Sequence, residues 1–397
     1  MTVDVIVVGG GITGCSAAAF LAAAGASVIL VERDGLASGA SGANAGGIWH
    51  PFDPTLVALY RESVGLYRDL AAQSSIFRMG ASPVGLLAVS YDEAHVRAHA
   101  ATVAPVYPEL VPTVLDPVAL RDVEPLAGPD VWACRLDLGY PIAPASGTYG
   151  FATLAESRGV TVRAGRGARL LRDGDRVTGV ELAGGERLVA GSVIVTAGPW
   201  TPALLDPTGA WRPIRPLWGV VAELEMERGP RHIVDETSDE GAAWVARDVI
   251  AGPRAADPGF AAAAARTQRE TIDDGHVEVG VVPTPGVTSV GATHLDVEPD
   301  PADWIEPLLL RAARFLPAIA DAPIRGVRCC PRPLCADGRP LVGAVPGSRD
   351  LYIAAGHGPW GISTGPATAR MVTELALGGS PVIPAELDPA RFGIPGA

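Results

Sequence analysis

The sequence predicts an α/β protein in which a Rossmann-like unit is discontinuous along the chain and carries an inserted antiparallel sheet. Two observations support this. The chain opens with an apolar strand, a glycine-rich turn, an alanine-rich helix and a second apolar strand. Further buried-strand segments lie in the middle and at the end of the chain, and the residues between them alternate as antiparallel strands do.

The opening segment, residues 3–34, reads VDVIVVGGGITGCSAAAFLAAAGASVILVERD. Residues 3–8 are an apolar run with one polar break, which predicts a buried parallel strand. Residues 15–24 are strong helix formers and end before a glycine, so they predict a helix. Residues 28–31 predict a second buried strand.

The turn between the first strand and the helix fits G-x-G-x-x-G. Gly9 makes the tight turn, Gly11 lets the backbone approach a pyrophosphate, and Gly14 lets the helix pack on the strand. The helix N-terminus offers N–H groups and partial positive charge to phosphates. Glu32 follows Gly11 by 21 residues, where a carboxylate can bind ribose hydroxyls and disfavours the 2′-phosphate of NADP. The segment therefore predicts a site for FAD or NAD.

The remaining elements follow from apolar periodicity and from the glycines and prolines between them. Residues 84–135 predict short strands around a helical segment at 94–104, and an alanine run at 261–265 predicts a short helix. Other predicted helices span residues 60–72, 147–158, 303–315 and 366–377, and other predicted strands span 159–163, 168–172, 177–182, 188–197, 217–224, 277–282, 289–293 and 351–355.

A chain of 397 residues is long enough for two domains. We expect the dinucleotide-binding domain to be assembled from residues 1–83, 145–213 and 326–397. The substrate-binding domain would then comprise residues 84–144 and 214–325, which carry the antiparallel pattern.

Composition excludes several classes of function. The net charge of −13 argues against nucleic acid as a partner. All 31 basic residues are arginine, so lysine-based Schiff-base chemistry is excluded. The five cysteines are odd in number and lack a metal-ligand spacing, which indicates no metal and a reducing compartment. No stretch has transmembrane length and the N-terminus lacks a basic signal-peptide start, so we expect a cytoplasmic protein.

Three separated motifs resemble the FAD-dependent amine and amino-acid oxidases of the D-amino acid oxidase, glycine oxidase and sarcosine oxidase type. They are VVGGGITG with Glu32, VIVTAGPW at residues 193–200, and RPLCADGRPLVG at 332–343 followed by AAGHGPWGISTGPATAR at 354–370. The resemblance spans almost the whole chain and implies FAD as the cofactor. It also implies oxidation of the C–N bond of a small amino acid, or of a secondary or cyclic amine with a carboxylate. A hydride passes to flavin N5, an imine results, and oxygen or another acceptor takes the electrons.

The last motif carries the principal site residues that the resemblance implies. Arg332 falls where the glycine oxidases place a carboxylate-binding arginine, and a guanidinium suits that task because it is always charged and binds in a bidentate fork. GHGPWGISTG precedes a helix whose N–H groups and dipole can stabilise negative charge at the flavin N1/C2 carbonyl region. The backbone candidates there are Gly356, Gly358, Gly361 and Ile362.

Other parts of the chain supply further candidates. Gly46, Gly47 and Ile48 are expected on the opposite side of the ring, and His50 can orient substrate or take a proton from the amine. Trp360 stands where the family often has a polar or basic residue, which predicts a more apolar pocket. His294 and Tyr140 are additional pocket candidates. The remaining cofactor contacts implied are Ile12, Thr13, Arg33, Ser41, Ala45, Ala197, Gly198 and Trp200.

Cys330 defines an alternative mode of cofactor attachment. It lies seven residues before Asp337, the offset at which the related sarcosine oxidases carry a covalently flavinylated cysteine. Glycine oxidases hold FAD without a bond, and this chain lacks the active-site lysine of the sarcosine oxidases. We therefore expect non-covalent FAD, with a link through Cys330 as the alternative.

Two other functions remain open on the sequence alone. A 2-hydroxy acid also offers a carboxylate, so an FAD-dependent 2-hydroxy-acid dehydrogenase fits the same residues. SGASGANAGGIWHP, residues 38–51, resembles a loop of the FAD domain that trims aminomethyl-uridine in tRNA, although the charge of −13 argues against an RNA substrate.

Overall fold

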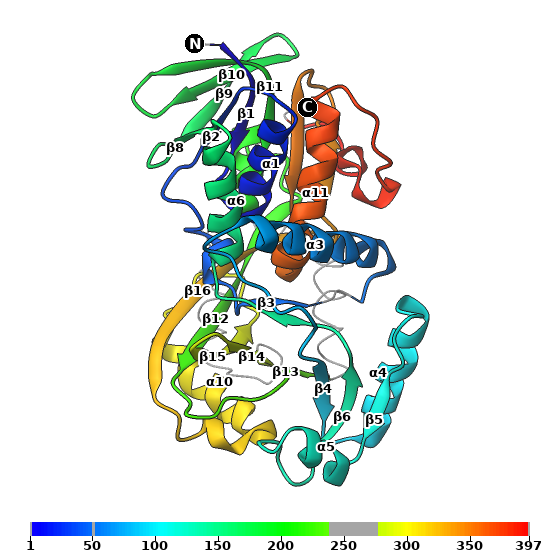
Figure 1. Ribbon diagram of the computed structural model, residues 1–397. Coiled ribbons are helices and arrows are strands. Elements are labelled where there is room, and N and C mark those ends of the chain that lie inside the picture. The colour runs from blue at the N-terminus through cyan, green and yellow to red at the C-terminus, as the bar shows by residue number, and fades with distance from the viewer. Residues whose placement is uncertain (1, 50–51, 238–276, 396–397) are drawn as a thin grey trace.

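The computed structural model describes residues 2–49, 52–237 and 277–395, and it places them in two lobes stacked end to end (Figure 1). The first and last described elements both lie in the upper lobe of that view. A long helix, α3 (Pro54–Gln73), crosses the waist between the lobes. The helix expected at 261–265 lies outside the described residues.

The upper lobe is built on a mixed sheet with the strand order β17-β18-β11-β1-β2-β8. The strands from β18 to β8 run parallel, while β17 pairs antiparallel with β18. A hairpin, β9 and β10, pairs antiparallel with the start of β11. The strands are β1 (Thr2–Val8), β2 (Val28–Val31), β8 (Thr161–Arg163), β9 (Ala168–Asp173), β10 (Arg176–Leu182), β11 (Arg187–Val195), β17 (Leu341–Ala344) and β18 (Leu351–Ala355).

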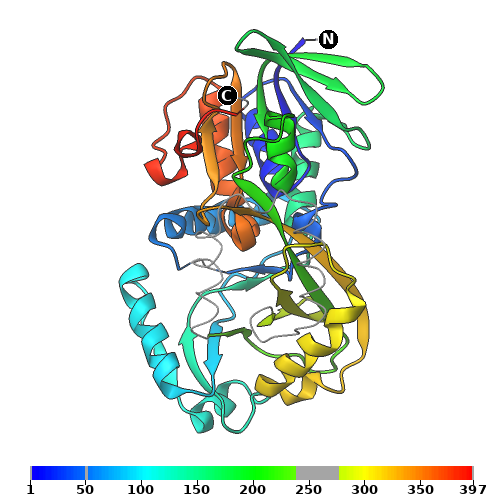
Figure 2. The ribbon, with the colours of Figure 1, turned by 180° about the vertical axis from the view of Figure 1, so that it is seen from behind.

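Three helices cover one face of this sheet: α6 (Ser146–Ser157), α1 (Ile12–Ala23) and α11 (Gly361–Ala376) (Figure 1). The alanine-rich α1 lies between the other two and is buried on nearly every side, as its small side chains allow. Figure 2 shows the opposite face, where the short helix α7 (Thr201–Leu205) packs beside β9. The sheet is therefore covered on both faces, as parallel sheets require.

The helix α3 begins at Pro54, six residues before the predicted start at residue 60. Asp53 caps it, because its Oδ1 accepts hydrogen bonds from Thr55 N at 2.8 Å and Leu56 N at 3.2 Å. Pro54 occupies the first helical turn, where its missing N–H costs nothing. The cap and the proline together set the start of the helix.

The helix α11 begins at Gly361, five residues before its predicted start, and contains Pro366. Proline removes the N–H that would bond to the carbonyl four residues earlier, which here belongs to Ile362. The hydroxyl of Tyr67 on α3 donates to that carbonyl oxygen at 2.9 Å. A side chain from another element thus satisfies the freed carbonyl and lets the helix pass through the proline.

The lower lobe holds a second sheet with the order β16-β12-β15-β14-β13-β4-β6-β5. Its pairs are antiparallel, as predicted, apart from the parallel pair of β13 with β4. The helix α10 (Ala302–Phe315) packs on β14 and β15, and α4 (Glu93–Val106) packs on β4 and β6, with α5 (Pro117–Val123) nearby. The strands are β4 (Leu86–Ser90), β5 (Thr113–Leu115), β6 (Trp132–Leu136), β12 (Ile214–Leu224), β13 (Ile233–Glu236), β14 (Val277–Thr284), β15 (Val287–Thr293) and β16 (Ile324–Cys335).

The strand β16 crosses the domain boundary expected at residue 326. It pairs with β12 along its whole length, from Ile324 opposite Leu224 to Cys335 opposite Ile214. The chain then enters β17 of the first sheet. We propose that the domains divide by sheet, so that β16 belongs to the lower lobe.

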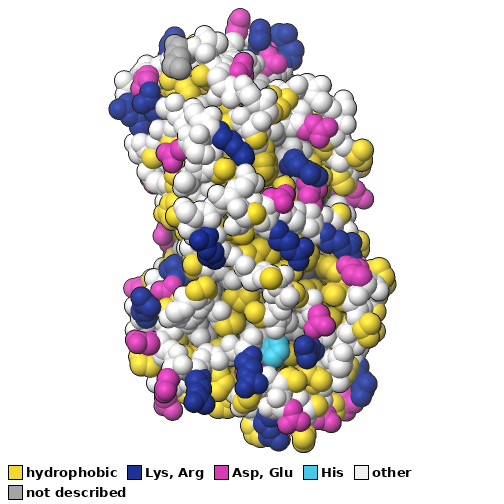
Figure 3. Space-filling view, in the orientation of Figure 1, with side chains coloured by type: hydrophobic (Ala, Val, Ile, Leu, Met, Phe, Trp, Pro, Cys, Tyr) yellow, Lys and Arg dark blue, Asp and Glu magenta, His cyan; other side chains and the backbone are white. Residues whose placement is uncertain are grey.

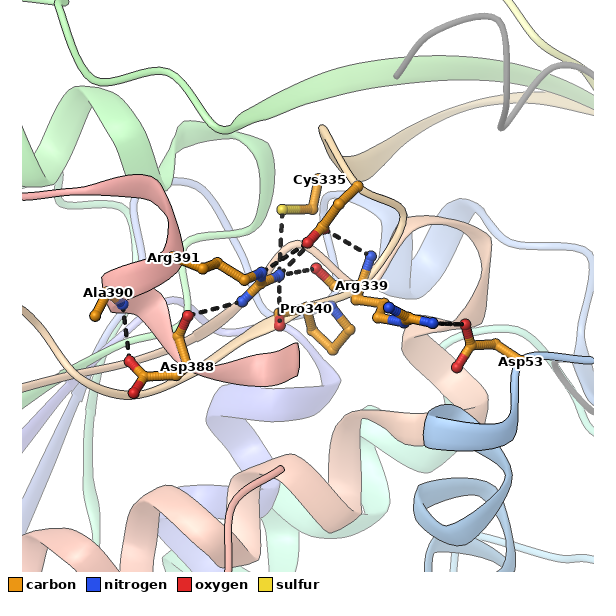
Figure 4. Close-up of polar contacts among 8 residues, drawn as sticks. Asp53, Cys335, Arg339, Pro340, Asp388, Ala390 and Arg391 are labelled. Carbon is orange, nitrogen blue, oxygen red and sulfur yellow. Dashed lines mark hydrogen bonds and ion pairs between the residues drawn. The ribbon is translucent and has the colours of Figure 1, made fainter. Parts of the chain in front are cut away.

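A polar network ties the loop after β16 to the cap of α3 and to the C-terminal segment (Figure 4). Arg391, near the C-terminus, binds the Asp337 carboxylate with Nε to Oδ2 at 2.7 Å. Its Nη2 also donates to the carbonyl oxygens of Arg339 at 2.7 Å and Pro340 at 3.1 Å. The Arg339 side chain in turn binds Asp53, the cap of α3. These contacts fix the loop against α3 and the C-terminal segment.

Candidate functional site

A cavity of about 1170 Å³ runs from the upper sheet to one face of the lower sheet. Its wall includes Val8, Val31 and Ala355 at the carboxyl ends of β1, β2 and β18, and Thr196 just after β11. Ligands bind at this edge in open parallel sheets. The volume exceeds the range of about 300–1,000 Å³ that is typical for one small ligand, so the cavity can accept a dinucleotide and a small molecule together.

The space-filling view shows hydrophobic side chains gathered around the waist between the two lobes, near the level of α3 (Figure 3). The larger part of the cavity lining is likewise apolar. Charged and polar side chains interrupt this apolar lining at several places, among them Glu32, Asp235 and Arg332, and each one restricts what the cavity can hold.

The glycine turn after β1 is packed so closely that side chains cannot replace its hydrogens. Gly9 has φ +118°, and a Cβ there would collide with the carbonyl oxygen of Thr196. A Cβ at Gly14 would collide with the carbonyl oxygen of Gly9. The Thr196 hydroxyl donates to the carbonyls of Val8 at 3.0 Å and Gly9 at 3.1 Å, which joins the turn to the end of β11. The turn thus brings backbone within reach of a ligand.

Two side chains complete the dinucleotide end. The Glu32 carboxylate accepts hydrogen bonds from Gly10 N at 2.6 Å and Asp34 N at 2.9 Å, which hold it at the cavity wall. Ser41 Oγ accepts from Ile12 N at 2.9 Å, at the N-terminus of α1. A helix N-terminus, a glycine cradle and a fixed carboxylate fit the pyrophosphate and ribose of FAD. The residues present therefore suit the cofactor that the resemblance implies.

Most of the predicted cofactor residues line this cavity. The Arg33 guanidinium lies 4.4 Å from the Trp200 ring centre, and both side chains contribute to the wall. The other predicted residues found in the wall are Gly9, Gly11, Ile12, Thr13, Glu32, Ser41, Ala45, Gly47, Ala197, Gly198, Cys330, Gly358, Gly361 and Ile362, together with Trp360 and Arg332.

Four predicted cofactor residues, Gly14, Gly46, Ile48 and Gly356, lie behind the wall. Gly46 and Gly356 have φ values of +86° and +88°, which glycine adopts without strain, and Ile48 is fully buried in the short strand β3 (Gly47–Ile48). Gly14 lies inside α1, whereas Gly46, Ile48 and Gly356 are each next in the chain to residues that do line the cavity, such as Gly47 and Ala355.

Arg332 is the buried cation of the cavity. Only 8% of the residue is exposed, and its Nη1 donates to the Thr293 carbonyl at 2.8 Å. The guanidinium lies over Gly219 on β12, where a Cβ would collide with Nη2. Within the described part of the chain, no carboxylate lies within ion-pair distance of it. Burial lowers the pKa of Arg332, while Cys330 and Glu278 act in the opposite direction.

Cys330 lies in the wall close to the loop after β2. It is buried, and its Sγ is 3.8 Å from the carbonyl oxygen of Ala40. Burial raises the pKa of the Cys330 thiol, although Arg332 and Arg328 oppose that shift. The environment therefore favours the thiol over the nucleophilic thiolate.

The histidine and tyrosine side chains near the site differ in their surroundings. His294 lines the cavity, whereas the Tyr140 hydroxyl accepts a hydrogen bond from Arg68 Nη2 at 2.8 Å. His357 is buried, its Nε2 lies 2.8 Å from Thr368 Oγ1, and burial lowers its pKa to about 4. His50 lies outside the described residues.

The sequence analysis missed several polar or aromatic residues of the wall, among them Trp49, His99, Asp235 and Glu278. Glu278 was detectable in principle because it is the one charged residue of its strand, and Asp235 because it forms an acidic pair with Glu236 at the end of another strand. Such charges are rarely buried without a reason. Trp49 and His99 gave no such signal.

Two searches of the described residues were negative. No group of three or more His, Cys, Asp or Glu side chains in them could hold a metal ion. None of the helices found there has both the length and the apolar character needed to span a bilayer.

Residues 4–375 match the protein family described as DAO, FAD dependent oxidoreductase. Among curated proteins, the chain is 29% identical to a glycine oxidase of Pseudomonas aeruginosa over 99% of this chain and 98% of that protein. It is 31% identical to a D-amino acid dehydrogenase of Cereibacter sphaeroides over 62% of this chain and 48% of the relative, so this match spans about half the relative's length.

Among solved structures, an iminodiacetate oxidase from a Chelativorans species superposes with a TM-score of 0.79. The superposition covers 99% of both chains at 21% sequence identity. At this identity the likeness concerns the fold, and it supports the α/β class predicted from the sequence.

Proposed function

The chain belongs to the DAO family of FAD-dependent oxidoreductases, and from that premise we propose that it oxidises the C–N bond of an amino acid or amine that carries a carboxylate. The observation that supports the substrate class most strongly is Arg332. It is a buried guanidinium that faces the cavity and has no carboxylate partner among the residues described. A substrate carboxylate supplies the missing partner.

The upper lobe holds the cofactor in this proposal. The backbone of Gly9 to Gly11 and the start of α1 contact the pyrophosphate, and Glu32 binds ribose hydroxyls. The N-terminus of α11, at Gly361 in the cavity wall, would offer N–H groups and a positive dipole end to the flavin ring. The cysteine environment favours non-covalent attachment.

When bound, FAD would supply a hydride acceptor for the carbon that bears the amine, and oxygen or another electron acceptor would finally take the two electrons. The amine nitrogen would also have to release one proton to give the neutral imine, which water would hydrolyse.

The side chains of this protein position the substrate for that step. Arg332 holds the carboxylate and so fixes which hydrogen faces the ring, which converts a random encounter into an oriented one. Trp49 and Trp360 add aromatic surface to the wall and exclude water. His50, whose position lies outside the described residues, stays our candidate for orienting the amine or accepting its proton.

We also propose that the protein works in the cytoplasm and without nucleic acid. Its five cysteines are all unpaired, which supports a reducing compartment, and its net charge of −13 disfavours phosphate backbones.

The first test is the visible spectrum of the yellow holoenzyme during anaerobic addition of amino acids, N-methyl amines and cyclic amines. We expect at least one carboxylate-bearing amine to bleach the flavin bands. If only 2-hydroxy acids bleach them, the protein is a hydroxy-acid dehydrogenase. If nothing in either set does, the proposed substrate class is wrong.

The second test replaces the buried cation. Arg332→Leu should retain FAD but lose about 100-fold or more in kcat/KM for carboxylate substrates, because a charge-assisted pair is lost. Arg325→Leu, an exposed arginine on the same strand, is the matched control. Loss of FAD from Arg332→Leu with unchanged substrate affinity after reloading would contradict the assigned role.

A further inference from the structure

The face of the lower sheet that borders the cavity carries a row of small residues with one carboxylate in it. Asp235 on β13 pairs with Ala88 on β4 and with Gly280 on β14, and Gly280 pairs with Gly291 on β15. All four residues line the cavity. Glycines inside strands mark places where something else approaches the backbone closely. The Asp235 carboxylate therefore stands among neighbours too small to cover it.

Trp49 borders the space that these small residues leave open beside Asp235. A Cβ at Gly280 would lie 2.9 Å from Trp49 Cη2 and 3.6 Å from Asp235 Oδ1, so the indole and the carboxylate flank the same glycine. An indole beside a carboxylate is a suitable environment for an organic cation, which can pair with the charge and pack on the ring.

Glu278 places a second carboxylate in the same wall. It lies on β14 two residues before Gly280, and its side chain is 28% exposed. Its Oε2 is 3.8 Å from His294 Nε2. The charge of Glu278 raises the pKa of Asp235 and also that of Arg332, so it lies close enough to both groups to interact with them.

The neighbouring carboxylate, Glu236, is buried and has partners for both of its oxygens, which makes it a useful comparison for Asp235. Its two oxygens bind Arg311 at 2.8 Å and 3.0 Å, and it also accepts from Val279 N at 3.3 Å. Asp235 makes no comparable side-chain bond within the described ranges. Burial raises the pKa of Asp235 well above its ordinary value, and Glu278 and Glu236 raise it further. An unpaired acid in this position is costly unless a ligand neutralises it.

Two other groups point independently to a polar ligand. Arg332 is a buried cation that faces the same cavity without a carboxylate partner in the described chain. His99 on α4 lines the cavity too, and its Nε2 is buried with no hydrogen-bond partner in the structure as described. Burial lowers the pKa of His99 to about 4, so its ring is neutral near pH 7.

We propose that the substrate is an amino acid whose side chain ends in a cation, with its carboxylate on Arg332 and its cationic group between Asp235 and Glu278. This inference rests on the proposed function and specifies its substrate. A cationic group beside Asp235 would favour the ionised form of that carboxyl, and the substrate carboxylate would pair with Arg332 at the same time. Glu236 is not part of this cation site, since Arg311 already binds it.

Binding tests the cation site without requiring turnover. 4-Guanidinobutanoate has a carboxylate and a guanidinium but no α-amine, and 4-ureidobutanoate is its neutral counterpart. Calorimetric titration of the holoenzyme should give at least tenfold tighter binding of the guanidino compound, because its charged group replaces a neutral donor. Equal affinities, or tighter binding of the ureido compound, would overturn the proposal.

Variants assign the effect to the carboxylates. Asp235→Asn and Glu278→Gln should each reduce the ratio of the two affinities about tenfold or more, and FAD absorbance reports whether the variants fold. Asp122→Asn, an exposed acid on α5, is the control and should leave the ratio unchanged. If neither carboxylate variant changes the ratio, these residues do not bind the cation.

Turnover separates this inference from the proposed function. If arginine or lysine bleaches the flavin at least tenfold more efficiently than citrulline or norleucine in the same enantiomer, both hold. If the neutral amino acids are oxidised as well as the basic ones, the inference fails and the proposed function stands. If the guanidino compound binds preferentially but no amino acid is oxidised, the cation site stands and the proposed reaction fails.

Discussion

The two ends of the cavity are built by different means. At the cofactor end, the wall is mostly backbone at the carboxyl ends of strands, where Gly9 and Gly14 leave no space for a side chain. At the substrate end, the wall is the face of a sheet, and Arg332, Asp235 and Glu278 project into it from β16, β13 and β14. The cofactor end is formed largely by one short sequence motif. The substrate end is formed by residues that are far apart in the sequence and come together only when their strands pair.

This difference predicts how each end tolerates change. A site made of backbone cannot adapt by moving a side chain. A single added Cβ there collides with main-chain atoms, so the backbone itself must move. A side-chain site can exchange one group for another while the sheet stays intact, so its mutations should alter selectivity before stability.

The largest expected effect is at the cofactor end. Gly14→Ala places a Cβ on the Gly9 carbonyl, so we expect loss of FAD from the purified protein and destabilisation of several kcal/mol, that is ~3 kcal/mol or more. Absorbance at the flavin bands measures the FAD content, and urea unfolding measures the loss of stability. Gly65→Ala is the control, because a Cβ on this α3 residue would meet nothing within 4 Å. An FAD-replete Gly14→Ala protein would show that the turn is more pliable than its packing indicates.

The next largest effect concerns the stability of the folded protein at acidic pH. Because burial holds the pKa of His357 at about 4 in the folded protein, it stabilises the fold above its unfolded pKa near 6.5, and this stability is lost as the pH falls toward 4. Between pH 7 and pH 5 we expect a loss of about 2 kcal/mol from this residue. Urea titrations of His357→Gln should show a shallower decline than the parent protein.

His99 gives the same test for the substrate end, since its pKa is also lowered to about 4. His99→Gln should flatten the decline less, because His99 is less completely buried than His357. His95→Gln, a histidine substitution on the same helix, is the matched control. A larger effect from His99 than from His357 would reverse the assignment of the cofactor end as the more tightly packed one.

A smaller effect is expected at the floor of the substrate end. Gly280→Ala brings a Cβ to 2.9 Å from Trp49 Cη2, so the indole must move by a few tenths of an ångström. We expect FAD content to stay normal while kcat/KM for the preferred amine falls about tenfold. Steady-state kinetics measure this change in kcat/KM, with Gly65→Ala as the control variant. Loss of FAD would mean that the two ends are mechanically coupled.

The smallest effect is expected for Cys330→Ser. Because burial favours the thiol form, we predict non-covalent FAD that stays in the supernatant after acid precipitation of both the parent protein and the variant. Flavin that precipitates with the parent chain and is released from the variant would establish a bond through Cys330.

The sequence allowed the cofactor end to be predicted because local chemistry determines it. The glycine spacing, the alanine-rich helix and Glu32 lie within residues 3–34. β1 and β2 form where the pattern places them, while α1 begins at Ile12, three residues before the predicted start. Helix starts were harder. α3 begins early through the Asp53 cap, and α11 passes through Pro366 because Tyr67 satisfies the freed carbonyl, a contact between residues 295 positions apart.

The substrate end could be predicted only where a motif crossed it. Arg332 was identified because RPLCADG lies beside it in the sequence. Asp235 and Gly280 meet only through strand register, and Trp49 joins them from a loop almost two hundred residues earlier. No local sequence pattern predicts these contacts, so the substrate selectivity that we propose could be inferred only from the structure.

The strand order also determines when the cofactor can be loaded during synthesis. β1 is made first, but its parallel neighbour β11 ends at Val195, and the far wall of the flavin end waits for Ile362. The Arg391 contacts that fix the loop at Asp337 come later still (Figure 4). A ribosome-bound nascent chain therefore exposes an incomplete, largely apolar cleft for most of its synthesis, and flavin uptake becomes one of the last events in the maturation of the enzyme.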